Sequence, residues 1–300
     1  MPAYRTGQPT ALFHCSRVGT TAANPGLIHE RHCGQHYIRK HQVIRFEFGD
    51  GGMVHCKVYC PRPESCLMFY LRDLQVVGYT ADSTVLQHPR CTIIGQHTVV
   101  TKRFVQGDCW LLQIVLQPST LYLLTGIPAY ELTNTFIDAE AIWGGEIRAV
   151  HEQMCNNNSV EEVIRIVEVF LGKLISRAKH SLQGIDKVNA VILNQNKPLS
   201  IDKLASESCL SNRQFQRRFT ERTGIGPKLF EKVVRFEKAF FMKNANPNLD
   251  WLSIALACGY HDYQHLAKDY KYFTQLTPKG FYELDAQAPE RLFGVVEIQQ

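Results

Sequence analysis

Two kinds of hydrophobic periodicity divide the chain. Between about residues 40 and 118, short apolar runs alternate with turn sequences such as GDGG and QGD; the runs are HQVIRFEF, CLMFYL, STVLQ, CTIIG, HTVVTKRF and CWLLQIVL. Short β-rich runs separated by such turns are typical of an antiparallel barrel or sandwich. From residue 138 onward, apolar residues recur at steps of three and four, which predicts helices.

Two helices are predicted directly after the β-rich part, in IDAEAIWGGEIRAVHEQM and SVEEVIRIVEVFLGKLISRAK. Ser159 and Glu162 have capping-box spacing at the start of the second one. This helix carries a wide apolar stripe, formed by Val160, Val163, Ile164, Val167, Phe170, Leu171 and Leu174. The stripe is wider than a coiled-coil seam, and it fits packing against the β-rich part and a dimerisation face equally well.

The stretch SNRQFQRRF, residues 211–219, predicts a basic amphipathic helix. Phe215 and Phe219 share one face, whereas Arg213, Gln216 and Arg217 lie on the other side. Taken alone, this pattern also suits an ordinary surface helix with a solvated basic face. Upstream, LSIDKLASESCL predicts a short helix, for which Ser200 is a candidate cap, followed by a tight turn. A short helix, a turn and a basic helix together predict a helix-turn-helix unit.

The same pattern recurs about 50 residues later. In LDWLSIALACGYHDYQHLAKDYKYF, Ile254 and Ala255 lie on a first helix, and Leu266 begins the apolar face of a second. Gly259 suits a turn residue that must adopt a positive φ. Between the two units, KLFEKVVRFEKAFFMKN predicts a long connecting helix.

Residues 185–285 resemble the DNA-binding part of the AraC/XylS family of bacterial transcription regulators, most clearly in IALACGYHDYQHLAKDYKYFTQLTPKGFYE. The resemblance implies two helix-turn-helix units that present their second helices to successive major-groove segments of promoter DNA, with RNA polymerase as a further partner. It implies base-facing positions at Asn212, Arg213, Gln216, Arg217, Asp262, Tyr263, Gln264, Ala267 and Lys268. The β-rich part is loosely similar to the family's cupin-like effector domain.

Side-chain chemistry favours the first of these two sets. Arginine can bind guanine and glutamine can bind adenine through two hydrogen bonds, which gives roughly 1–3 kcal/mol of discrimination per pair. Phosphate contacts are expected from Ser211, Arg218, Arg222 and Lys271. The second unit is mildly acidic, because Asp262 and Asp269 oppose its lysines, so we expect it to bind more weakly and to help through shape or backbone contacts.

The distribution of charge agrees with a phosphate-binding region. The whole chain has a formal net charge of +5. Residues 1–183 carry +2 and residues 184–285 carry +4. Residues 197–243 contain 11 basic and 5 acidic side chains, whereas residues 244–285 contain 3 and 5. Positive charge is therefore concentrated around the first predicted unit, as expected of a nucleic-acid footprint.

These patterns predict an α+β protein of two domains, a number that the length of 300 residues also favours. Residues 1–180 are expected to form a cupin-like antiparallel barrel or sandwich with a helical pair at about 138–180, which senses a small molecule or assembles the protein. Residues 185–285 are expected to form the double helix-turn-helix domain. Residues 286–300 remain as a C-terminal tail.

Candidate metal ligands are sparse. His29, His32, Cys33 and His36 form the densest group, and Cys56, Cys60 and Cys66 form the next. Neither spacing matches a zinc finger, so a polar loop with histidines is the plainer interpretation of the first group. Phosphate-binding glycine loops, nucleophile elbows and paired acids are not found in the sequence. We therefore expect no metal, cofactor or enzymatic activity, with a metal-dependent cupin enzyme fused to a DNA-binding domain as a remote alternative.

The remaining expectations concern location and partners. The ten cysteines are scattered rather than spaced as a disulfide framework, which favours reduced thiols. Apolar runs of roughly 18 residues and a signal sequence are both missing, which favours a cytoplasmic protein without a membrane partner. The expected partners are double-stranded promoter DNA, a small-molecule effector and a second copy of the chain. The main rival function is an architectural DNA-binding factor that takes no ligand.

Overall fold

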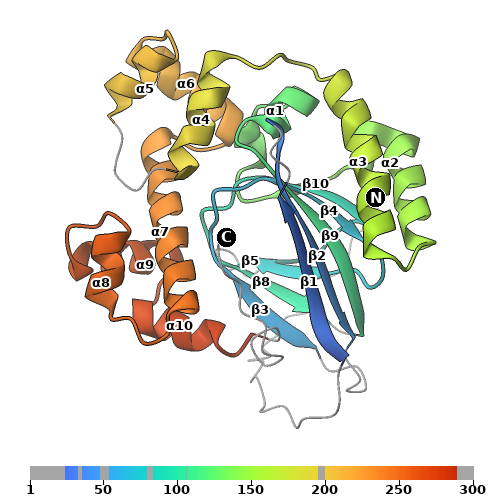
Figure 1. The fold of residues 1–300 in the computed structure, drawn as a ribbon, viewed down its shortest axis with the longest axis horizontal. Coiled ribbons are helices and arrows are strands. Elements are labelled where there is room, and N and C mark those ends of the chain that lie inside the picture. Colours follow the sequence, from blue (N-terminus) through green and yellow to red (C-terminus); the bar gives the residue numbers. More distant parts are fainter. Residues whose placement is uncertain are drawn as a thin grey trace.

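The computed structural model describes residues 24–32, 36–47, 54–79, 84–105, 107–194 and 200–288. Its strands lie in the centre of the molecule, a pair of helices covers one side of them, and the C-terminal helices lie along the other side (Figure 1). The predicted α+β class is confirmed.

The described strands form two antiparallel sheets. They are β1 (Asn24–His32), β2 (Ile38–Glu47), β3 (His55–Tyr59), β4 (Cys66–Tyr70), β5 (Val76–Tyr79), β6 (Val85–Gln87), β7 (Cys91–Ile94), β8 (Thr101–Val105), β9 (Asp108–Leu116) and β10 (Phe136–Asp138). The larger sheet has the order β1-β2-β9-β4-β7-β10, and the smaller one has the order β3-β8-β5-β6. Of the two architectures expected, the described residues thus form a sandwich rather than a closed barrel.

Strand β9 shows why its sequence is an almost continuous apolar run. Trp110, Leu112 and Ile114 pack toward the helices on the outside of the larger sheet, whereas Leu111 and Val115 belong to a separate cluster on its inner face. Both faces of this central strand are buried, so alternation of polar and apolar residues is lost.

Helices dominate the chain after β9. They are α1 (Thr120–Thr125), the 3-10 helix η1 (Ala129–Leu132), α2 (Glu140–Cys155), α3 (Val160–Ser176), α4 (Gly184–Asn194), α5 (Ile201–Glu207), α6 (Asn212–Thr223), α7 (Pro227–Ala245), α8 (Trp251–Ala257), α9 (Tyr263–Thr274) and α10 (Pro278–Asp285). None of the helices in the described ranges is both long and apolar enough to cross a membrane.

The apolar stripe of α3 is covered within the chain. Val163, Val167 and Phe170 are buried together with α2 and the outer face of the larger sheet. The Ser159 side chain accepts a hydrogen bond from the Glu162 backbone N–H, as the capping-box spacing predicted. Packing on the sheet therefore accounts for the width of the stripe, and the alternative of a dimerisation face is not needed to explain it.

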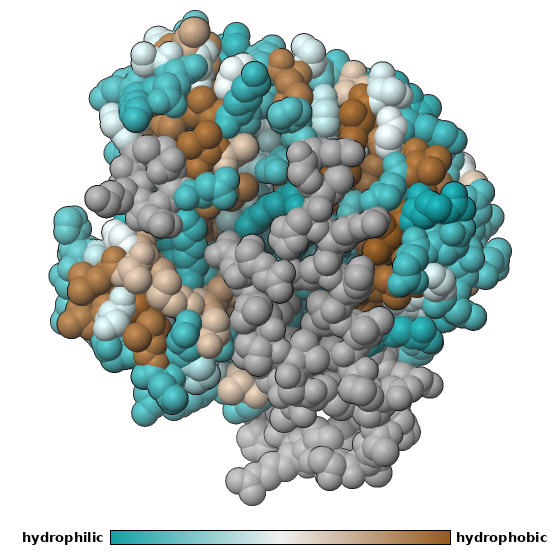
Figure 2. Space-filling view, in the orientation of Figure 1, coloured by the Kyte–Doolittle hydropathy of each residue, from teal (hydrophilic) through white to brown (hydrophobic). Residues whose placement is uncertain are grey.

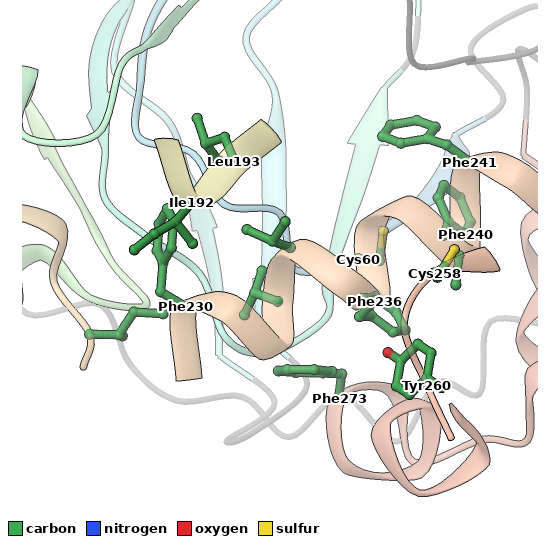
Figure 3. Packing of buried hydrophobic residues seen from close by; sticks show 14 of the residues in the cluster. Cys60, Ile192, Leu193, Phe230, Phe236, Phe240, Phe241, Cys258, Tyr260 and Phe273 are labelled. Atoms are coloured by element: carbon green, nitrogen blue, oxygen red, sulfur yellow. The ribbon is translucent and has the colours of Figure 1, made fainter. Parts of the chain in front are cut away.

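The C-terminal helices share a core with the β sandwich. Val58, Cys60 and Val100 from the sandwich belong to the same buried cluster as the aromatic residues of α7. Figure 3 shows Cys60 beside the helix that carries Phe236 and Phe240. Helix α6 also packs against α1 and η1. The two parts of the chain are thus in direct contact.

Candidate nucleic-acid interface

The first helix-turn-helix unit consists of α5 and α6. Ala205 is buried where the two helices cross, and Phe215 and Phe219 fill the core beneath α6. The Leu210 backbone N–H donates to the Ala205 carbonyl at 2.9 Å, which closes the turn. Cys209 adopts a left-handed conformation there, with φ of 54°. Sequence reasoning placed Cys209 in the turn but did not predict this conformation, because it is rare for a residue with a side chain.

The second unit, α8 and α9, repeats this geometry. Ala255 is buried at the helix crossing, and the Tyr260 backbone N–H donates to the Ala255 carbonyl at 2.9 Å. Gly259 has φ of 80°, which confirms the predicted positive φ. Leu266 and Tyr270 face the core from α9. The same backbone turn is therefore built with a glycine in one unit and a cysteine in the other.

The start of α6 is strongly capped. The Ser211 side chain accepts a hydrogen bond from the Gln214 backbone N–H, and the Gln214 side chain accepts one from the Ser211 backbone N–H. Asn212 donates to Asp202 of α5. By contrast, Ser200 occupies the predicted N-cap position of α5, but its side chain makes no cap hydrogen bond. These hydrogen bonds hold the N-terminal end of α6 in place, and the basic face of the helix begins at that end.

The predicted base-facing residues occupy matching positions in the two units. Asn212 is the first residue of α6 and Tyr263 the first of α9. Counted from these first residues, Arg213 corresponds to Gln264, Gln216 to Ala267 and Arg217 to Lys268. All of these side chains are exposed except Ala267, which is partly exposed. Each unit therefore has an accessible polar face on its second helix.

The predicted phosphate contacts have different surroundings. Ser211 and Lys271 are exposed, and Lys271 donates to the carbonyl of Gln275 at the end of α9. Arg218 is partly buried, with its Nη1 atom 3.5 Å from Gln183 Oε1. These three side chains lie at the surface of the two units.

Arg222 requires a correction. Its guanidinium is buried, forms an ion pair with Asp186 of α4 at 2.8 Å and donates to Gln183 at 3.0 Å. It also lies over the ring of Tyr122, which belongs to α1. The prediction of a phosphate contact for Arg222 is therefore wrong. The sequence period did not reveal this, because Asp186 and Tyr122, which bury the guanidinium, lie 36 and 100 positions away along the chain.

The acidic residues of the second unit are also engaged internally. Asp269 is buried and pairs with Lys232 and Arg235 of α7, at 3.2 and 3.8 Å. Asp262 caps α9 and accepts a hydrogen bond from the backbone N–H of His265, which lowers the pKa of its carboxyl. The carboxylate of Asp269 therefore points to α7 rather than to the exposed side of α9. The exposed face of α9 is less acidic than the sequence count indicated.

Helix α7 separates the two units. It has 19 residues, and its ends carry one unit each (Figure 1). At a rise of about 1.5 Å per residue, such a helix spans about 28 Å, close to the roughly 34 Å of one DNA turn. The second unit exposes apolar side chains, because Leu252 and Leu256 of α8 are about half exposed. A brown patch lies at the lower left of Figure 2, where α8 is found in Figure 1.

Metal-binding and redox candidates do not assemble into a site in the described residues. No group of three or more histidine, cysteine or acidic side chains is placed to hold an ion there. The side chains of His29, His32 and Cys33 lie outside the described residues. Cys60 and Cys66 are buried, and burial raises the pKa of the Cys66 thiol. The eight cysteines in the described ranges form no disulfide with one another.

One protein family and several solved structures are similar to this chain. The family described as a helix-turn-helix domain matches residues 204–283. No curated protein sequence matches the chain. Among solved structures, ToxT from Vibrio cholerae is 10% identical over 83% of this chain and 98% of that chain, with a TM-score of 0.45.

Two DNA-binding domains also match. The DNA-binding domain of AdpA, described as a global transcriptional factor and solved with a target DNA, is 20% identical over 35% of this chain and 95% of that one, with a TM-score of 0.32. An AraC-type regulator from Chromobacterium violaceum is 25% identical over 35% and 93%, with a TM-score of 0.31. Such TM-scores do not decide the fold, whereas the family match covers both units. Residues 204–283 of this chain form a helix-turn-helix domain of the AraC type.

Proposed function

We propose that this protein is a sequence-specific transcription regulator that binds double-stranded promoter DNA through α6 and α9. The observation that carries the proposal is the exposed, matching placement of polar side chains on the second helix of each unit. In a helix-turn-helix protein, the N-terminal residues of this helix contact base edges in the major groove. Arg213 and Gln264 hold such positions in α6 and α9.

The two units make unequal contributions in this proposal. Arg213, Gln216 and Arg217 supply three side chains that can read bases by hydrogen bonding. In α9, only Gln264 and Lys268 are side chains of this kind. The remaining positions are the aromatic ring of Tyr263, the methyl group of Ala267 and Asp262, which caps the helix. We expect α6 to supply most of the sequence discrimination. Ser211, Arg218 and Lys271 are proposed to bind phosphates, which orients both helices without reading sequence.

The N-terminal sandwich is proposed to sense a small molecule. Its contacts with α6 and α7 support a regulatory role, because a ligand that changes the sandwich also acts on the surfaces that hold the DNA-binding helices. Such coupling requires states that differ in affinity for both ligand and DNA. A second copy of the chain and RNA polymerase, which the family resemblance implies, complete the proposed partners.

Enrichment of randomised duplex DNA by the full chain tests this function. Wild type is compared with an Arg213→Ala, Gln216→Ala, Arg217→Ala variant at near-physiological salt. The matched control is Lys203→Ala with Lys228→Ala, which also removes two exposed positive charges but lies outside α6. The proposal predicts one motif for wild type and for the control, and loss of a defined block of that motif in the triple variant. Equal motifs in all three proteins would refute base reading by α6.

A further inference from the structure

Two histidines lie at the start of α9, beside its exposed polar face. His261 precedes the helix and His265 is its third residue, and both side chains are exposed. Their ring centres are 5.8 Å apart. The Oδ1 atom of Asp262, which caps α9, accepts a hydrogen bond from the His265 backbone N–H at 2.8 Å and lies 2.9 Å from His265 Nδ1. The second helix of this unit thus begins with a solvent-accessible pair of a carboxylate and an imidazole.

The Asp262 carboxylate fixes the orientation of the His265 ring. Hydrogen bonds from His265, first of all from its backbone N–H, lower the pKa of the Asp262 carboxyl, so at neutral pH this group is ionised and can only accept. The hydrogen of the neutral ring is therefore on Nδ1. Its outer nitrogen, Nε2, makes no hydrogen bond to the described residues, and the side chain is 53% exposed. Protonation of the ring gives Nε2 a hydrogen that it can donate to a ligand.

The corresponding position in the first unit has a different use. Counted from the first residue of each helix, His265 of α9 corresponds to Gln214 of α6. The Gln214 side chain turns back and accepts a hydrogen bond from the Ser211 backbone N–H at 3.1 Å, so it belongs to the cap. In α9 the Asp262 side chain provides the cap, and the outer nitrogen of His265 stays accessible next to Gln264.

We propose that His265 is a further DNA contact of the second unit, and that its protonated ring donates from Nε2 to a phosphate oxygen. Such a hydrogen bond is charge-assisted, and the Asp262 carboxylate on the opposite nitrogen stabilises the imidazolium. Histidine changes its charge between pH 5 and 8. The contact therefore forms at mildly acidic pH and is lost as the pH rises. The inference rests on the proposed function, because it places α9 against DNA.

The charges around this ring are few. Asp262 faces its Nδ1 atom, the ring of His261 lies beside it, and Lys268 follows one turn further along α9. Helix α8 has only uncharged side chains. Residues 244–285 contain 3 basic and 5 acidic side chains, so one added positive charge is a large change for this unit. On α7 and α10, ion pairs join Lys232 and Arg235 to Asp269, and Lys279 to Glu283.

Titration of a fluorescent duplex with the full chain, at pH 6 and pH 8 and several salt concentrations, tests this contact. We expect wild type to bind about threefold to fivefold more tightly at pH 6. The slope of log K against log salt should be steeper there by about 0.9, the value for one further phosphate. Preferred and scrambled duplexes should show the same change, because a phosphate contact reads no sequence. Burial lowers the pKa of His88 to about 3 and that of His97 to about 4, so neither titrates in this range.

Three substitutions make the test specific. His265→Gln removes the titrating ring and keeps a polar side chain, so we expect affinity close to that of wild type at pH 8 and little change at pH 6. His261→Gln removes the neighbouring exposed histidine and is the matched control, which should keep most of the change. His265→Lys has a positive charge at both pH values, so its affinity should be high and its salt slope steep at both. Circular dichroism at each pH checks that the variants are folded.

The proposal is wrong if His265→Gln keeps the full pH dependence of wild type, if His261→Gln loses as much of it, or if wild type shows none. Each of these results leaves the proposed function standing when wild type prefers its selected duplex to the scrambled one at pH 8. Absence of that preference contradicts the proposed function instead, and the scrambled duplex still reports on the phosphate contact of His265.

Discussion

The carboxylate of Asp186 and the guanidinium of Arg222 form a buried ion pair, 2.8 Å long, that joins α4 to α6. Their side chains are 1% and 4% exposed, so solvent screens the pair little. Removal of one partner leaves the other charge buried without compensation. We predict that Arg222→Ala lowers the free energy of unfolding by roughly 3–5 kcal/mol. Urea denaturation followed by circular dichroism measures this change.

Arg213→Ala is the matched control, because it removes an exposed arginine from the same helix. Its free energy of unfolding should stay within about 0.5 kcal/mol of wild type. If Arg222→Ala were equally mild and only weakened DNA binding, Arg222 would be a phosphate contact after all.

The turn at Cys209 offers a stabilising substitution. Its φ of 54° lies in the left-handed region, where a Cβ atom costs about 1–2 kcal/mol. We predict that Cys209→Gly raises the free energy of unfolding by about 1 kcal/mol, because glycine adopts this conformation without that cost. Cys209→Ala retains the Cβ atom and should change little. Gly259→Ala, at the equivalent turn, should show a loss of similar size, and a neutral effect there would contradict the explanation.

Arg218 and Arg213 should differ in the kind of DNA-binding defect they cause. For Arg218→Ala we predict weaker binding to all sequences and a slope of log K against log salt that is reduced by about one. For Arg213→Ala we predict a loss of roughly 1–3 kcal/mol on the preferred site and relaxed preference at one base position. Titrations at several salt concentrations, on preferred and scrambled duplexes, separate the two. Identical salt slopes and identical specificity losses would rule out the assigned roles.

The buried histidines make stability depend on pH. The pKa values of His88 and His97 are lowered to about 3 and about 4, mainly by burial, whereas an unfolded imidazole titrates near 6.5. Between these values the unfolded chain binds more protons. Each histidine should therefore reduce the free energy of unfolding by about 1.4 kcal/mol per pH unit as the pH falls from about 6 to about 4.

Unfolding in urea at pH 7, 6 and 5 checks this dependence. Together the two histidines supply one part of the change in unfolding free energy with pH. His97→Gln should remove about half of that part. An unchanged slope in this variant would mean that the pKa of His97 is not lowered in the folded protein.

The helix-turn-helix region was predictable because its signals are local. Helix period, turn residues and a repeat within about 50 positions placed the helices and the exposed face of α6. The role of Arg222 was not predictable, because its partners Asp186 and Tyr122 reach it only through packing between distant segments. Asp269 was misjudged for the same reason, since α7 supplies its two cationic partners.

In the sandwich, the predicted apolar runs correspond to six described strands, β2, β4, β6, β7, β8 and β9, whereas β1, β3, β5 and β10 were not predicted. Strands β3, β5 and β10 have five residues or fewer and at most two consecutive apolar residues before a glycine, a polar or a charged residue, so their identity depends on their neighbours in the sheets. The burial of Arg103, which is only 7% exposed on β8, could not be foreseen either. In the sequence it belongs to an ordinary alternating run, HTVVTKRF, and only the packing of the two sheets reveals that it is buried.

Motif enrichment with single substitutions in each unit tests the central claim most directly. Randomised duplex DNA is selected with wild type, Arg213→Ala and Gln264→Ala under the same conditions. Two helices held at the ends of α7 should read two blocks of bases separated by about one helical turn, roughly 10 base pairs. We predict that Arg213→Ala relaxes one block and Gln264→Ala the other. If both variants relaxed the same bases, or neither changed the motif, the assignment of α6 and α9 as two base-reading helices would be refuted.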